Sequence, residues 1–97
     1  MDLPRALAAQ IAALAADSGA ERVLLFGSRA RGDSHPRSDI DLAVFGMPEH
    51  AQARFRLALE ELPTLLKCDV VAVHDGLDPE LLTNITREGV PLYEQSA

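Results

Sequence analysis

The sequence predicts a single small α/β domain over residues 1–97, with a mixed β-sheet flanked by helices. Segments with helical spacing of their apolar residues alternate with short β-branched and aromatic runs, and no repeat or linker interrupts them. Apolar residues make up 47% of the chain and charged residues 25%, which is the balance of a folded domain rather than a disordered one.

The first half of the chain predicts a helix, a strand, one helical turn and a second strand. Apolar residues recur at every third or fourth position in Leu3–Asp17, which indicates an amphipathic helix. Arg22–Phe26 is predicted as a strand and Ser28–Arg31 as a helical turn, followed by a polar loop, Gly32–Ser38. The second strand is predicted over Asp39–Phe45.

The second half predicts a long helix, a strand, a shorter helix and a final short strand. The long helix covers Ala51–Leu62 and ends before Pro63, and Leu66–Val73 is the third strand. Asp78 is the expected N-cap of the last helix, and the final strand lies at Pro91–Tyr93. The long helix is sufficient for a right-handed crossover, so the second and third strands should be parallel neighbours. The shorter connection before Asp39 also allows the first strand to run antiparallel beside the second.

Three aspartates in the predicted strands are candidate metal ligands. Asp39 and Asp41 are two positions apart and should point to the same face of their strand, while the other face is apolar and carries Ile40, Leu42 and Val44. Asp69 lies in the expected parallel neighbour. Carboxylates that converge repel one another and recruit a cation, and hard oxygen ligands favour Mg²⁺ or Mn²⁺.

The letters GSRARG after the first strand form a candidate anion site. Gly27 would let a phosphate approach the backbone, and the Ser28 hydroxyl with free N–H groups at the start of a helical turn would bind an anion. Arg29 and Arg31 would add charge-assisted contacts to phosphate oxygens. An ordinary P-loop is excluded, because Asp33 follows the second glycine where that loop requires lysine.

Composition narrows the classes of partner and compartment. The net charge of −6 disfavours broad attraction to a phosphate backbone, so nucleic acid is not expected as the main partner. No apolar run is long enough to span a bilayer, and no secretory signal opens the chain. Cys68 is the only cysteine, which rules out an internal disulfide. We therefore expect a soluble cytoplasmic protein with no membrane partner.

Other polar and aromatic residues have simpler interpretations. His35, His50 and His74 are scattered in or next to loops without metal-ligand spacing, which favours solvated or structural roles. Cys68 is expected to pack on the apolar face of its strand, and Tyr93 is expected to be a hydrophobic anchor.

Taken together, the motifs resemble a known signature. Gly27-Ser28, ten intervening residues and then Asp39-x-Asp41 resemble the signature of the DNA polymerase beta-like nucleotidyltransferase superfamily. The run FGSRARGDSHPRSDIDLAVF is most similar to the minimal nucleotidyltransferases, which are often encoded beside HEPN-domain ribonuclease toxins as their antitoxins. The resemblance extends over nearly the whole chain, including Asp69 in a late strand, and implies the nucleotidyltransferase fold.

The resemblance also implies roles for the metal ligands. Asp39 and Asp41 would bind two Mg²⁺ ions, with Mn²⁺ as an alternative metal, and Asp69 would complete the coordination of one ion while helping to deprotonate the acceptor hydroxyl. Two metals in such a site stabilise both the attacking and the leaving oxygens. Gly27 and Ser28 would hold the β and γ phosphates of ATP.

The implied activity is protein adenylylation. AMP would pass from ATP to a hydroxyl of a partner protein, a HEPN toxin held in a hetero-oligomer, which would silence the toxin. Arg29 and Arg31 would contact the triphosphate. Two alternatives stay open, namely an antitoxin that works by binding and occlusion alone, and a nucleotidyltransferase that acts on a small molecule.

Overall fold

The computed structural model describes residues 1–96. Helices and strands follow along the chain as α1 (Arg5–Asp17), β1 (Arg22–Phe26), α2 (Ser28–Arg31), β2 (Ile40–Phe45), α3 (Glu49–Glu60), β3 (Cys68–Ala72), α4 (Pro79–Glu88) and β4 (Val90–Glu94). None of the helices in this described part has the length and apolar character needed to cross a membrane.

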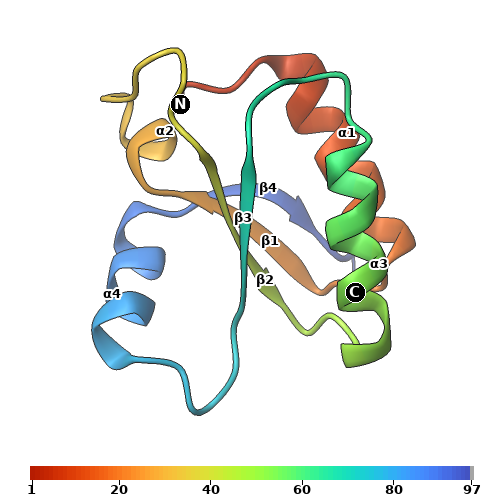
Figure 1. The fold of residues 1–97 in the computed structure, drawn as a ribbon. Helices are drawn as coiled ribbons and strands as arrows, with labels where there is room; N and C mark the ends of the chain where they lie inside the picture. Colours follow the sequence, from red (N-terminus) through yellow and green to blue (C-terminus); the bar gives the residue numbers. More distant parts are fainter. Residues whose placement is uncertain (97) are drawn as a thin grey trace.

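The four strands form one mixed sheet in the order β3-β2-β1-β4 (Figure 1). The central strand β1 is antiparallel to both β2 and β4, whereas β2 and β3 are parallel. The predicted fold class and the predicted parallel pairing of β2 with β3 are confirmed. The parallel pair is joined through α3, as a crossover helix requires.

The two faces of the sheet bury different helices. On one face, α1 and α3 lie side by side (Figure 1) and pack against alternate residues of β1 and β2. Phe55 of α3 belongs to this larger core. On the other face, α4 contributes Ile85 to a smaller cluster with Leu24 and Ala43. The larger core contains the fully buried side chains Ile11, Val23, Leu25, Ile40, Leu42 and Phe55.

Prolines and the strand ends account for the differences between the predicted and observed bounds. Pro4 and Pro48 stand immediately before α1 and α3 and set a helix-compatible backbone for the first turn. Helix α3 ends at Glu60 rather than next to Pro63, because the residue before a proline disfavours the helical conformation. Strand β2 begins at Ile40, so Asp39 lies just outside the sheet.

The packing of the larger core predicts that loss of the Phe55 side chain strongly destabilises the protein. Phe55→Ala removes a fully buried ring between α3 and the sheet and should lower the free energy of unfolding by about 3–5 kcal/mol. Leu57→Ala is the matched control on the same helix, because Leu57 is 62% exposed, and it should change stability by less than about 0.5 kcal/mol. Urea unfolding followed by circular dichroism measures both, and equal losses would contradict the assignment of the core.

Candidate active site

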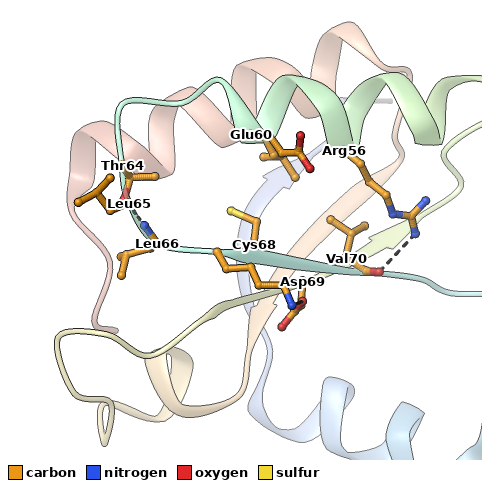
Figure 2. A pocket seen from close by; sticks show the side chains of 10 residues that line it. Arg56, Glu60, Thr64, Leu65, Leu66, Cys68, Asp69 and Val70 are labelled. Atoms are coloured by element: carbon orange, nitrogen blue, oxygen red, sulfur yellow. Dashed lines mark hydrogen bonds and ion pairs between the residues drawn. The ribbon is translucent and has the colours of Figure 1, made fainter.

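Asp41 and Asp69 lie next to each other across the parallel pair. Their Cα atoms are partners in the register of β2 and β3, and neighbouring strands are about 4.8 Å apart. Successive side chains of β2 point to opposite faces of the sheet. Leu42 is buried under α1 and α3, so Asp41 lies on the other face, the one that carries the smaller cluster with α4. The same alternation in β3 puts Cys68 in the larger core and Asp69 on the other face, as Figure 2 shows.

The electrostatics of Asp41 indicate a crowded acidic site. Burial raises the pKa of the Asp41 carboxyl, and the negative charges of Asp69 and Asp39 raise it further. Asp39 itself is exposed and immediately precedes β2. The structure therefore brings the three predicted carboxylates into one region, with Asp41 and Asp69 on the sheet and Asp39 at the end of the preceding loop.

The donor set fits a hard divalent cation, since it consists of carboxylate oxygens that repel one another without a positive charge between them. Within residues 1–96, no three His, Cys, Asp or Glu side chains converge tightly enough to bind a single ion. Asp41 and Asp69 are thus a pair on the rigid sheet, whereas Asp39 belongs to a loop and its position depends on how that loop is held.

Gly27 places the start of α2 directly against Asp41. Its backbone has φ 78° and ψ −159°, a region that is essentially restricted to glycine. A Cβ atom at this position would overlap the Oδ2 atom of Asp41 and would lie 3.5 Å from its Cβ. The Gly27-Ser28 motif and the carboxylates, which are far apart in sequence, are therefore in contact.

The two arginines of the GSRARG segment have protein partners in this structure. Arg29 is buried, and its guanidinium donates hydrogen bonds to backbone carbonyls. Arg31 is more exposed and forms ion pairs with Asp33 at 3.0 Å and with Glu88 at 2.5 Å. These carboxylates raise the pKa of Arg31, and its positive charge in turn lowers the pKa of Asp41.

A hollow of about 580 Å³ opens beside Asp69, between the end of α3 and β3 (Figure 2). Its apolar lining includes Leu59, Leu65 and Leu66, and its charged rim includes Lys67, whose Nζ atom lies 3.3 Å from the Oδ1 atom of Asp69. Gly27, Asp41 and Asp69 consequently follow one another across the sheet, from β1 through β2 to β3, while the hollow lies on the α3 side of β3, the face from which the Asp69 side chain points away.

The family comparison agrees with this arrangement. Residues 10–97 match the family model for polymerase beta nucleotidyltransferase domains. The chain belongs to this nucleotidyltransferase family. No curated protein matches it.

Solved structures support the same assignment. A minimal nucleotidyltransferase is 40% identical to this nucleotidyltransferase, with a TM-score of 0.73 and 90% of each chain covered. A toxin-antitoxin structure with AMP-PNP is 23% identical, with a TM-score of 0.69, covering 92% of this chain and 74% of that chain. A mutant of the toxin-antitoxin MntA-HpeT, with two aspartates changed to glutamate, is 21% identical at the same TM-score and coverage. The last two share the fold.

Two acidic residues of this region were not singled out from the sequence. Asp2 accepts hydrogen bonds from Ser34, and Glu88 pairs with Arg31 across 57 positions of the chain. No local sequence pattern indicates these contacts, and only the tertiary structure reveals them. The simpler predictions agree with the structure, because Tyr93 and Cys68 pack against the larger core and the histidines are exposed.

The contact between Gly27 and Asp41 predicts different outcomes for two glycine substitutions. Gly32→Ala introduces only backbone strain, because Gly32 has φ 86° and the nearest atom to an added Cβ is 4.0 Å away; it should cost about 1–2 kcal/mol of stability. Gly27→Ala adds an overlap with the Asp41 carboxylate and should also abolish Mg·ATP binding, measured by calorimetric titration. Equal ATP affinities in the two variants would contradict the contact.

The crowding of negative charge around Asp41 predicts that Asp41→Asn stabilises the metal-free protein. A carboxyl whose pKa is raised by folding favours the folded state when protonated, and this contribution is lost as the pH rises through the folded pKa. The variant should therefore have a higher Tm at pH 7 in EDTA, and its advantage should vanish below about pH 3.8. Asp75→Asn, at an exposed loop position, is the control and should leave the Tm unchanged.

Proposed function

We propose that this nucleotidyltransferase transfers AMP from ATP to a hydroxyl of a partner protein, a HEPN toxin, and so acts as its antitoxin. The observation that carries the proposal is the contact of the Gly27-Ser28 turn with Asp41, which has Asp69 beside it on the neighbouring strand. A phosphate-binding turn next to paired carboxylates is what phosphoryl transfer requires, since its catalysis consists mainly of positioning and charge stabilisation.

The residues have separate tasks in this proposal. Gly27 and Ser28 bind the β and γ phosphates, and Asp39, Asp41 and Asp69 hold two Mg²⁺ ions. When bound, Mg²⁺ neutralises charge on the triphosphate and on the departing pyrophosphate. Asp69 accepts the proton of the acceptor hydroxyl as the hydroxyl oxygen forms a bond to the α phosphorus and the bond to pyrophosphate breaks.

The order of features across the sheet supports a separate entry side for the acceptor. The nucleotide motif reaches Asp41 from β1, whereas Asp69 belongs to β3, the edge strand, and the hollow lies between this strand and the end of α3. An acceptor that enters from the β3 edge would meet Asp69 without displacing the triphosphate. Leu65, which is fully exposed at this hollow, offers an apolar contact to a protein partner.

The toxin partner and ATP are supported by fold neighbours. One toxin-antitoxin structure holds AMP-PNP, an analogue of ATP, and a second is the MntA-HpeT pair. A nucleotidyltransferase of this fold in such a pair fits the proposed role in a hetero-oligomer. Transfer to a small molecule is the alternative, and activity on a free sugar or antibiotic without any protein partner would favour it.

Asp69→Asn separates catalysis from simple occlusion. The change keeps the shape of the side chain but removes a metal ligand and a base, so AMP transfer should fall by a factor of about 10² to 10⁴, while Mg·ATP binding weakens less. The readout is the intact mass of the co-expressed protein from the adjacent reading frame, together with protection of cells. Asp75→Asn is the matched control and should transfer AMP normally.

The two modes of action give opposite results in this experiment. If catalysis silences the partner, the Asp69→Asn variant should bind it on gel filtration yet add no mass and give no protection. Full protection by this variant, with no mass added to the partner, would show that occlusion is sufficient and would contradict the enzymatic proposal.

A further inference from the structure

Arg29 is buried at only 6% exposure, and its partners are backbone carbonyls rather than carboxylates. The Nη1 atom donates to the carbonyl of Asp2 at 2.7 Å, Nε to that of Ser38 at 2.9 Å, and Nη2 to that of Pro36 at 3.3 Å. A buried guanidinium with such partners is costly to remove, because three carbonyls would lose their donors at once.

These hydrogen bonds join two segments that have no secondary structure of their own. One is the N-terminal segment before α1, and the other is the loop between α2 and β2. The N-terminal segment also donates a hydrogen bond to Arg29, from the backbone N–H of Asp2 to the carbonyl of Arg29 at 2.7 Å. The hydroxyl of Ser34, within the loop, donates to the Asp2 carboxylate at 2.7 Å, and this bond lowers the pKa of Asp2.

The loop ends at Asp39. Ser38, whose carbonyl Arg29 holds, is the residue immediately before Asp39, and β2 starts one residue later. An unsupported loop of this length would sample many conformations, and ordering its backbone would cost conformational entropy. The bonds from Arg29 therefore restrict the place at which Asp39 enters the acidic site.

We infer that Arg29 is a positioning residue, which together with Asp2 holds the loop so that Asp39 is presented to Asp41 and Asp69. This inference rests on the proposed function, since it assigns a purpose to the position of Asp39. It differs from the expectation for the GSRARG segment, in which Arg29 would contact the triphosphate. In the structure, its donors are occupied by backbone carbonyls of the N-terminal segment and of the loop itself.

The test uses Arg29→Lys and Arg29→Gln, with Arg37→Gln as the matched control. Arg37 is an exposed arginine of the same loop, so its replacement removes the same charge without touching the buried contacts. Lysine retains the charge at position 29 but lacks the planar fork that reaches several carbonyls. Thermal unfolding establishes that each variant is folded, and Asp2→Asn is a fourth variant that weakens the same network from the N-terminal segment.

Two readouts do not depend on turnover. Amide hydrogen exchange of residues 32–39 reports the loop, and titration with Mn²⁺ alone reports the acidic site. We expect faster exchange in the loop and Mn²⁺ binding weakened by about 10- to 100-fold in both Arg29 variants, which is the usual effect of losing a partner that orients a metal ligand. Asp2→Asn should show the same changes to a smaller degree, and Arg37→Gln should match the wild type.

Several outcomes would overturn the inference. Wild-type exchange and wild-type Mn²⁺ affinity in Arg29→Lys and Asp2→Asn would show that the network does not position Asp39. Loss of Mg·ATP binding with unchanged loop exchange and unchanged Mn²⁺ affinity would make Arg29 a direct phosphate contact. Failure of the wild type to bind Mn²⁺ would instead contradict the proposed function, and the exchange rates alone would then decide whether Arg29 orders the loop.

Discussion

The parallel pairing of β2 with β3 is the constraint on which the rest of the site depends. The apolar positions of β2 pack under α1 and α3, and this burial forces Asp41 onto the opposite face. The register then puts Asp69 beside it. A slip of one residue would bury the carboxylates and expose the core, so the hydrophobic pattern that stabilises the sheet also sets the geometry of the acidic pair.

The pairing of Asp41 with Asp69 lowers the stability of the metal-free protein. Two carboxylates on neighbouring strands repel each other, and the partly buried Asp41 is held with a raised pKa. The surrounding fold must compensate for this repulsion, which it does with the fully buried core on the other face of the sheet. Arg31 provides local relief, because its charge lies close enough to lower the pKa of Asp41 while Glu88 and Asp33 hold it in place.

The GSRARG segment divides its tasks between backbone and side chains. Gly27 allows close approach to Asp41 because it lacks a Cβ, and Gly32 ends the helical turn in the left-handed conformation. Arg29 ties the following loop to the N-terminal segment, and Arg31 ties the turn to α4. A short motif thus contacts elements from both ends of the chain, which explains why such a small domain can hold a charged site in place.

The sequence by itself determined the fold class and the parallel pairing of β2 with β3, because these follow from local periodicity and from the length of the crossover helix. The register that puts Asp69 beside Asp41 and the place of β4 in the sheet came from the tertiary structure. The sequence also indicated the family through the spacing of Gly27-Ser28 and the aspartates. Only the tertiary structure decided the surroundings of the arginines. Beside nearby partners, Arg29 bonds to Asp2 and Arg31 to Glu88, at opposite ends of the chain, and no local pattern encodes contacts over such a separation.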